Sequence, residues 1–234
     1  MTFSITARCE KTGQFGIAIS TRVIGVGSRC PYAKAGVGAV TSQASSNPYL
    51  GINGLKALEQ GMTAEEALQH VLAQDPAIDV RQVSVVDAKG NVAVHTGENC
   101  VGWFGHRTGK NYVAMGNMLV GEDTVLAMAE TFEENIDMDL SERLLKSLEA
   151  AQAAGGDKRG RQSAALYVVN EEEYPYMDLR VDEHVDPVQE LRRIFTLAQE
   201  QLVPRMKLMP TKKNPAGIND RAAMEKVGLI EEEK

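Results

Sequence analysis

The sequence has little of several residue types and patterns that mark particular classes of protein. Its three cysteines form no Cys-x-x-Cys pair, which argues against a disulfide framework and against a zinc ribbon. The four histidines lack the spacing of metal ligands, so we expect no metal site. The glycine pairs Gly25-x-Gly27 and Gly36-x-Gly38 lack the third glycine and the following helix of a dinucleotide-binding loop. We therefore expect no cofactor.

Positive charge is also scarce. Lysine and arginine number 25 against 32 acidic residues, and the net charge of −7 argues against nucleic acid and anionic membranes as partners. No run of about 18 apolar residues is present to span a membrane. The N-terminus lacks the basic segment and apolar core of a secretory signal. We expect a cytoplasmic protein whose partners are a small-molecule substrate and further copies of itself, as a homo-oligomer such as a dimer.

The remaining composition is that of a globular protein, with 43% hydrophobic and 24% charged residues. Alternating apolar and polar residues predict a strand from Phe3 to Ala7, and Phe15–Ile19 predicts the returning strand of a hairpin. We predict a loop over residues 23–34, and further strands at residues 35–41, 80–86, 91–95, 100–104, 112–116, 163–169 and 177–181. Helices are predicted around residues 52–60, 63–72, 125–132, 139–151, 187–198 and 220–227.

The predicted helices come in pairs between groups of strands. A doubly wound α/β fold needs a single helix between successive parallel strands, so this order disfavours it. We predict an α+β fold in which two antiparallel sheets lie between layers of helices, and we assign it to residues 1–203. Past Pro204 the chain has prolines and a glycine at Pro210, Pro215 and Gly217 and little periodicity. Residues 204–234 are therefore expected to form an extended tail that wraps the body or a partner subunit.

Thr2 directly follows the initiator methionine, at the start of the first predicted strand. Methionine is normally removed when a residue as small as threonine follows it. Removal of Met1 would give Thr2 a free α-amine beside its hydroxyl. Such an amine has a pKa of about 7.7–8.0, so a useful fraction is neutral near neutral pH and can accept the hydroxyl proton. Threonine at this position is also compatible with a protein of any other kind.

Five separated motifs narrow these alternatives. They are Thr2–Arg8; Gly36–Val40 with Gln43-Ala44 and Asn47-Pro48; Gly116-Asn117; Gly160–Leu166; and Asp178–Asp182. In this order they resemble the family called domain of unknown function 1028, which is grouped with the Ntn (N-terminal nucleophile) hydrolases, and the resemblance covers roughly residues 2–200. The resemblance implies a four-layer αββα sandwich and, by analogy, hydrolysis of an amide bond. Thr2 would be the nucleophile.

The start of the chain is also similar to the proteasome β subunits, another Ntn group. In that group an acidic residue, a serine and an arginine end the second strand, and a lysine starts the third. Ser20, Thr21 and Arg22 end the second predicted strand here, and Lys34 precedes the third. Ser20 stands where that group has its acid, so the acid that would hold the lysine is missing. Lys34 fits a solvated charge at a strand start equally well.

An amide hydrolase must also stabilise the oxyanion that forms during attack, and it does so with preorganised hydrogen-bond donors. The backbone N–H groups from Gln43 to Ser45 and the side-chain amide of Asn117 are the predicted donors. We therefore predict Thr2, Gln43 and Asn117 as catalytic residues. A turn asparagine at the end of a strand is the structural alternative for Asn117, and Gln43 has the same ambiguity.

A second set of residues is predicted to bind the substrate. Arg161 opens a strand after a glycine-rich loop, and its planar guanidinium suits a substrate carboxylate. Asp178 and Arg180 alternate on one face of a strand, where they form either a functional cluster or a solvated face. The predicted substrate-binding residues are Arg22, Asn47, Arg161, Gln162, Ser163, Asp178 and Arg180.

The hypothesis is a threonine-dependent hydrolase of a small amide, ureido or amino-acid-derived compound. A second hypothesis keeps the fold without catalysis, as a small-molecule binding or assembly module, and the missing acid at Ser20 favours it. A third keeps hydrolysis but uses Ser4 or Cys100 as the nucleophile. His95 and His106 lie near Cys100 in the sequence, and a cysteine with a histidine partner is a nucleophile pattern.

Overall fold

The computed structural model describes residues 2–228, which divide into two compact units. The first unit ends at Leu191 and the second begins at Arg192. Helix α5 (Pro187–Met206) spans this division, and α6 (Arg221–Lys226) lies in the second unit. The helix predicted around residues 220–227 is therefore confirmed, whereas the domain boundary after residue 203 stays a prediction.

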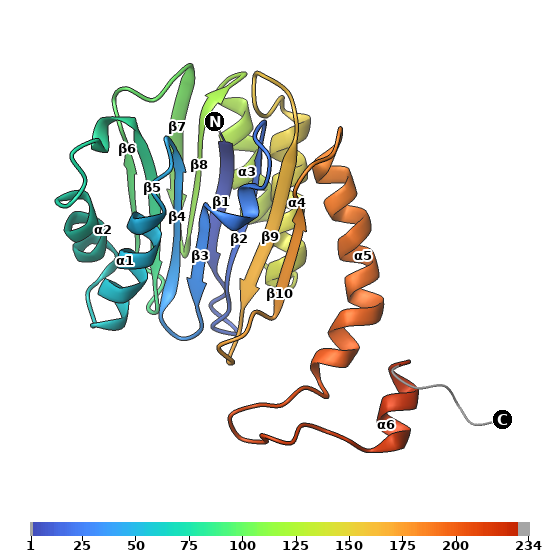
Figure 1. The fold of residues 1–234 in the computed structure, drawn as a ribbon. Coiled ribbons are helices and arrows are strands. Elements are labelled where there is room, and N and C mark those ends of the chain that lie inside the picture. Colours follow the sequence, from blue (N-terminus) through green and yellow to red (C-terminus); the bar gives the residue numbers. More distant parts are fainter. Residues whose placement is uncertain (1, 229–234) are drawn as a thin grey trace. The chain divides into compact units, whose positions relative to one another are not determined.

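Two antiparallel sheets form the body of the first unit (Figure 1). Sheet A contains β1 (Thr2–Arg8), β2 (Phe15–Thr21), β7 (Trp103–Gly109), β8 (Tyr112–Leu119), β9 (Ser163–Val169) and β10 (Met177–Val181). Its strand order is β10-β9-β2-β1-β8-β7, so β1 is an interior strand between β2 and β8. Sheet B contains β3 (Pro31–Lys34), β4 (Gly38–Ala44), β5 (Arg81–Asp87) and β6 (Val92–Thr96), in that order.

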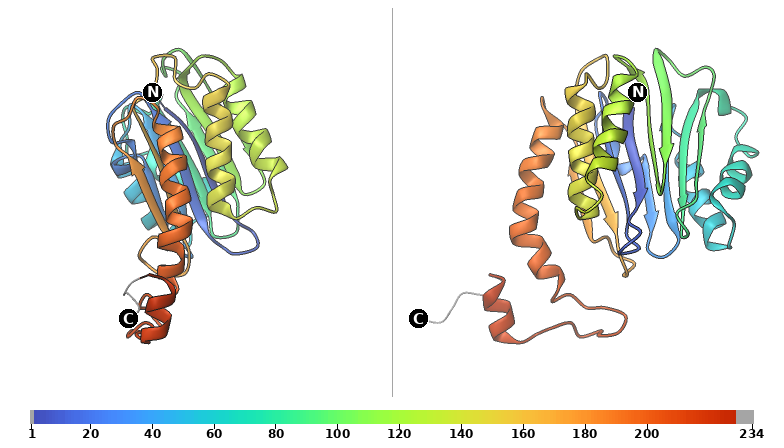
Figure 2. Two further views of the ribbon diagram at one scale, coloured as in Figure 1. Left: turned by 90° about the vertical axis from the view of Figure 1, so that its right-hand side faces the viewer. Right: turned by 180° about the vertical axis from the view of Figure 1, so that it is seen from behind.

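Helices cover the sheets in pairs, as the two views of Figure 2 show. Helices α1 (Pro48–Glu59) and α2 (Ala64–Leu72) pack on sheet B, and α3 (Asp123–Glu134) and α4 (Leu140–Ala153) pack on sheet A. Strand β1 contacts β4 and β5, so the two sheets face each other. The predicted mixed fold, with two antiparallel sheets and paired helices, is confirmed. None of the described helices has the length and apolar character needed to cross a membrane.

Some predicted boundaries are wrong. Residues 31–34 were expected in a loop, but they form β3 and pair with β4 across a turn in which Gly36 has a φ of 72°. Residues 100–102, expected in a strand, precede β7. Helix α1 begins at Pro48, earlier than predicted, because the Asn47 side chain caps it and accepts a hydrogen bond from the Tyr49 N–H at 3.0 Å.

The space between the sheets is apolar on one side and polar on the other. Beneath β2 and β9 it is filled by a hydrophobic cluster that includes Phe15, Ile17, Ile19, Val86 and Val169. Beneath β1 and β8 it is filled by hydroxyl and amide side chains that we call the polar seam. These are Ser4, Thr6, Thr41, Gln43, Gln82, Ser84 and Asn117, all of them buried.

Hydrogen bonds across the polar seam join the two sheets. The Thr6 hydroxyl lies 2.7 Å from the Thr41 hydroxyl and 2.8 Å from the Ser84 hydroxyl. One step along β1, the Ser4 hydroxyl donates to Gln43 Oε1 at 2.7 Å. Because buried polar groups are costly unless paired, these bonds fix which residues of β1 face sheet B. The seam leads along β1 to Thr2.

A separate set of contacts fixes the loop after β4. The Asp75 carboxylate accepts hydrogen bonds from Asn47 Nδ2 at 2.8 Å, from the Ala77 N–H at 2.9 Å and from Arg81 Nε at 2.9 Å. Arg81 also donates to the backbone carbonyl and to the hydroxyl of Ser45. Asp75 therefore ties the start of β5 to the chain that links β4 with α1. We call Asp75, Arg81, Ser45 and Asn47 the loop anchor.

We predict that Asp75→Asn destabilises the protein by about 1–3 kcal/mol at neutral pH, because the half-buried Arg81 loses its carboxylate. Burial raises the pKa of Asp75, but hydrogen bonds from Arg81, Asn47 and the Ala77 N–H outweigh it and lower the pKa to about 2. The carboxylate therefore stabilises fully above its unfolded pKa of about 3.9 and progressively less as the pH falls through 2.

Urea unfolding of the two proteins at a series of pH values tests this prediction. The difference in unfolding free energy should be largest at neutral pH and should shrink from about pH 4 downward. Asp137→Asn is the matched control, because it removes an exposed ion pair with Lys11 and should change little. A difference between wild type and Asp75→Asn that stays constant in acid would contradict the assignment.

Candidate active site

Thr2 is the first residue of β1, an interior strand of sheet A. It is paired in register with Thr21 of β2 on one side and with Asn117 of β8 on the other. Only 4% of its surface is exposed. Its hydroxyl donates to the Thr21 hydroxyl at 3.2 Å. Thr2 is thus held by both neighbouring strands, while Met1, whose removal was predicted, lies outside the described residues.

Two side-chain amides hold the backbone of Thr2. Gln43 Nε2 and Asn117 Nδ2 donate to the Thr2 carbonyl oxygen at 3.3 Å and 3.4 Å. The same two amides donate to Gln82 Oε1 at 2.7 Å and 3.0 Å. Gln82 Nε2 in turn donates to the carbonyls of Gly105 and Gly116 at 3.1 Å and 2.9 Å. Gln82 therefore sets the direction in which both amides face.

The structure brings together the three residues predicted as catalytic, although their catalytic role stays a prediction. Gln43 and Asn117 donate to the Thr2 main chain, which is the geometry of residues that position Thr2. Sequence reasoning missed Gln82. Its only signal is a long amide side chain on an alternating strand, and that pattern usually marks a face turned toward solvent. Here the face is buried against sheet A.

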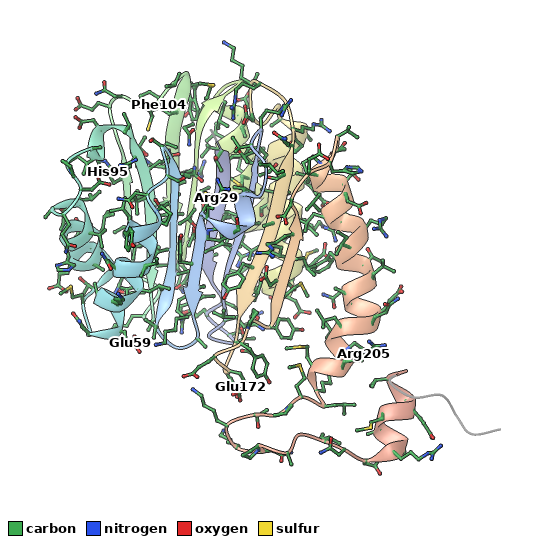
Figure 3. All side chains as sticks on the ribbon, viewed as in Figure 1. Arg29, Glu59, His95, Phe104, Glu172 and Arg205 are labelled. Atoms are coloured by element: carbon green, nitrogen blue, oxygen red, sulfur yellow. The ribbon has the colours of Figure 1, made fainter. Side chains whose placement is uncertain are left out.

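A cavity of about 150 Å³ opens beside Thr2. Its polar groups come from Thr2, Thr21, Arg29, Cys30 and Ser46. Figure 3 labels Arg29, which lies between β2 and β3 after a short 3-10 helix, η1 (Val26–Ser28). None of the described lining residues is an acid or a lysine.

The far wall of the cavity is formed where β4 ends. Ala44 has a φ of 68°, in the left-handed region that costs a residue other than glycine of order 1–3 kcal/mol. The Ser45 N–H donates to the Val80 carbonyl, whereas the Ser46 N–H donates to no described residue. The loop anchor holds both neighbours of Ser46, Ser45 through Arg81 and Asn47 through Asp75. Ser46, which lines the cavity, therefore has a backbone donor without an acceptor among the described residues.

The cysteine on the cavity wall is a poor nucleophile. Burial raises the pKa of Cys30 to about 11, and this effect outweighs a hydrogen bond with Ser46 and the positive charge of Arg29, which both lower it. Cys30 therefore stays a neutral thiol at physiological pH. Sequence reasoning gave Cys30 no role, because a lone cysteine in a loop carries no signal of its neighbours.

The alternative nucleophiles have other partners in the structure. Ser4 is fully buried and donates to Gln43. The Cys100 thiol donates to the Arg81 carbonyl at 3.6 Å, and burial raises its pKa. His95 bonds the Ile78 carbonyl and His106 bonds Thr96, so neither histidine is an observed partner of Cys100. These contacts give Cys100 no base.

Two of the four positions compared with the proteasome β subunits have partners elsewhere. Lys34 forms an exposed ion pair with Glu59 of α1. The Ser20 hydroxyl donates to the Ser163 carbonyl at 3.1 Å. Neither residue lines the cavity beside Thr2. The described residues of this cavity therefore provide no lysine that could act on Thr2.

The residues predicted to bind substrate fall into separate contacts. Arg22 donates to Gln162 at 2.6 Å, and Arg161 pairs with Asp186 at 2.5 Å. Ser163 is fully buried, accepts a hydrogen bond from the Val26 N–H and donates to the Val23 carbonyl. Ser163 thus holds the loop that forms one wall of the cavity.

Three further predicted residues lie away from the cavity. Asp178 and Arg180 lie 3.9 Å apart on β10, and the Arg180 stem packs against Gly27 of η1. Asn47 belongs to the loop anchor. Among the described residues that line the cavity, none is from the predicted substrate-binding set, so the binding role of that set stays a prediction. The described residues also contain no group of three or more side chains suited to a metal ion.

Comparison with solved structures finds a strong likeness to a protein of known structure. The crystal structure of protein SPO2555 from Silicibacter pomeroyi, from the family DUF1028, matches with a TM-score of 0.86 and 32% identity. The match covers 94% of this chain and 96% of that chain. Comparison with curated proteins gives no match.

Two weaker likenesses involve Anbu, described as an ancestral β-subunit. Anbu from Yersinia bercovieri matches with a TM-score of 0.37 at 12% identity, over 89% of this chain and 98% of that chain. An Anbu Gly-1 mutant from Hyphomicrobium sp. strain MC1 matches with a TM-score of 0.40 at 13% identity, over 88% and 99%. Scores this low do not support a common fold.

Family comparison covers most of the chain. Residues 2–191 match the family described as "Family of unknown function (DUF1028)", and this range contains both sheets, the four helices that cover them and the cavity beside Thr2. The family match and the likeness to SPO2555 agree with each other, and the chain therefore belongs to the DUF1028 family.

Proposed function

We propose that the protein is an amide-bond hydrolase of the Ntn type, with Thr2 as the nucleophile once Met1 has been removed. The substrate is a small amide, ureido or amino-acid-derived compound. The observation that carries the proposal is that Thr2 lines a cavity while its carbonyl is held by Gln43 and Asn117.

The proposal includes the fold. Two antiparallel sheets face each other, and a pair of helices packs on each, which is the order of a four-layer αββα sandwich. Thr2, the proposed nucleophile, begins β1, an interior strand of sheet A with β2 and β8 on either side. Thr2 also lies beside the cavity.

The reaction would proceed in two balanced steps. In the first, Thr2 Oγ1 attacks the substrate carbonyl carbon while the free α-amine of Thr2 takes the hydroxyl proton. The amine passes this proton to the leaving nitrogen, the C–N bond breaks, and an ester with Thr2 remains. In the second step water attacks the ester, the amine takes a proton from the water and returns it to Oγ1, and the acid product leaves. The Thr21 hydroxyl, 3.2 Å from Oγ1, orients the attacking group.

The oxyanion needs donors that no internal acceptor occupies. The amides of Gln43 and Asn117 already donate to the Thr2 carbonyl and to Gln82, so we assign them to positioning Thr2. Ser46 lines the cavity and its N–H donates to no described residue, so we propose this N–H as the oxyanion donor. The loop anchor supplies the rigidity that such a donor requires.

A second candidate function is a non-catalytic small-molecule binding or assembly module. It is favoured by the absence of acids and lysines among the described residues that line the cavity. The proteasome-like lysine would be Lys34, which pairs with Glu59 instead. The two candidates differ in what they require of Met1, because only the hydrolase needs a free Thr2 amine.

We predict that the purified protein lacks Met1. Intact-mass spectrometry should show a single species lighter by one methionine residue, because only then does Thr2 carry its own base. Thr2→Glu is a suitable control, since a large second residue should leave Met1 in place. Quantitative retention of Met1 in the wild type would favour the binding module over the hydrolase.

We predict that Thr2→Ala abolishes amide hydrolysis, because no hydroxyl remains to attack. Thr2→Ser should retain measurable turnover through the same amine and a primary hydroxyl. Trapping with an amide-directed electrophile, followed by peptide mapping, should place the label on Thr2 in both the wild type and the serine variant. Full turnover by Thr2→Ala, or a label on Ser4 or Cys100, would refute the assignment.

We predict that Asn117→Ala lowers kcat about 10-fold to 100-fold with little change in KM, because the Thr2 carbonyl loses one of its two amide donors. Steady-state kinetics on the best substrate from a screen of small amides measures this. Asn135→Ala is the matched control, since Asn135 follows α3 and bonds the Thr131 carbonyl, away from the cavity. A change in KM alone would show that Asn117 binds substrate and does not position the nucleophile.

A further inference from the structure

Arg29 brings a positive charge to the cavity beside Thr2, and no carboxylate among the described residues pairs with it. Arg29 is an exposed residue, and its positive charge lowers the pKa of the neighbouring Cys30 thiol against the larger effect of burial. The described residues that line the cavity include no acid.

The other arginines near this edge of the sheets have internal partners. Arg22 is bonded to Gln162, Arg159 to Asp157, and Arg161 to Asp186. Arg81 is paired with Asp75. Each of these guanidinium groups therefore has an acceptor within the protein. The guanidinium of Arg29 is available to a ligand.

The backbone of Arg29 is fixed on both sides of the residue. Its N–H donates to the Val26 carbonyl at 3.2 Å, and its carbonyl accepts a hydrogen bond from the Tyr32 hydroxyl at 2.9 Å. The preceding turn is held to sheet A, because the Val26 N–H donates to Ser163 and the Gly25 N–H donates to the Asp182 carbonyl. A guanidinium whose backbone is already fixed loses less conformational entropy when it binds a ligand.

The remaining wall of the cavity is aliphatic and comes from Val23, Ile24 and Val26. A volume of about 150 Å³ is below the roughly 300 Å³ at which pockets for drug-sized ligands begin. A ligand that fits must be small, carry one compact anion and have a short apolar part. The planar fork of arginine matches a carboxylate in two parallel hydrogen bonds.

From these features we propose that Arg29 binds the carboxylate of the substrate, and that the substrate class is N-acyl or N-carbamoyl derivatives of small aliphatic amino acids. This inference rests on the proposed function, since it names the substrate of the same cavity. With the carboxylate on Arg29 and the side chain against Val23 and Ile24, the amide lies between Thr2 and Ser46.

Binding to the Thr2→Ala variant tests the inference without turnover. N-acetylalanine and N-carbamoylalanine, each as the free acid and as the neutral methyl ester, are titrated by calorimetry. The acids should bind at least 10-fold more tightly than their esters. Arg29→Gln should weaken binding of the acids about 10-fold to 100-fold and leave the esters unchanged. Arg29→Lys should recover only part of the loss, because lysine keeps the charge without the fork.

Arg107→Gln is the control for the loss of one positive charge, since Arg107 lies on β7 and its guanidinium is near Glu130 and Glu133 of α3. It should bind the acids as the parent does. Equal affinity for acids and esters, equal loss in the Arg107 control, no binding of either acid, or equally tight binding of inorganic phosphate would each overturn the inference.

The same reagents separate this inference from the proposed function. Arg29-dependent binding of the acids, together with no hydrolysis by the protein that carries a free Thr2, would leave the carboxylate site in place and reject the hydrolase. Hydrolysis of neutral amides that depends on Thr2 and is unchanged in Arg29→Gln would support the hydrolase and reject the carboxylate site.

Discussion

The structure depends on how the carbonyl of Thr2 is held. Three buried amides, those of Gln43, Gln82 and Asn117, meet at this point from β4, β5 and β8. Burying an amide without partners costs several kcal/mol, whereas a fully paired network rigidifies the core around it. The oxygen of Gln82 accepts from both other amides, and its nitrogen is occupied by backbone carbonyls. One arrangement therefore satisfies all three side chains, and it determines where β1 begins relative to sheet B.

This constraint extends along the strand as the polar seam. A purely apolar interface between sheets would allow β1 to shift by two residues with little penalty, because aliphatic side chains can repack. Hydroxyl contacts at Thr6 and an amide contact at Ser4 remove that freedom, since a shifted register would leave the groups of both sheets unpaired. The apolar cluster beneath β2 and β9 supplies hydrophobic stabilisation, and the polar seam fixes the position of β1 relative to sheet B. Because the polar seam fixes β1, Thr2 at the start of this strand also keeps a fixed position.

Much of the fold could be predicted from the sequence, and much of the site could not. Alternation identified β1, β2 and β5, and the pattern of residues 63–72 identified α2, because these signals are local. Strand β3 was missed because Pro31 and the short run after it form a strand only by pairing with β4. Gln82 was missed because alternation does not tell a solvated face from one buried against a second sheet. Arg22 was predicted to bind the substrate and Arg29 was given no role, yet Arg29 lines the cavity and Arg22 does not, since loop folding decides which side chain reaches it.

The chemistry that the cavity can support depends on which charged side chains are absent from its described lining. The thiol of Cys30 is kept neutral by burial, so it offers packing and a weak donor without competing as a nucleophile. Lysine and carboxylate are absent from the described lining residues, so no side chain there can accept a proton at neutral pH. Under the proposed function, the Thr2 hydroxyl therefore takes its base from its own main-chain nitrogen, once that nitrogen is a free amine. Under the proposed function, the positive charge of Arg29, which lines the same cavity, would select substrates by charge.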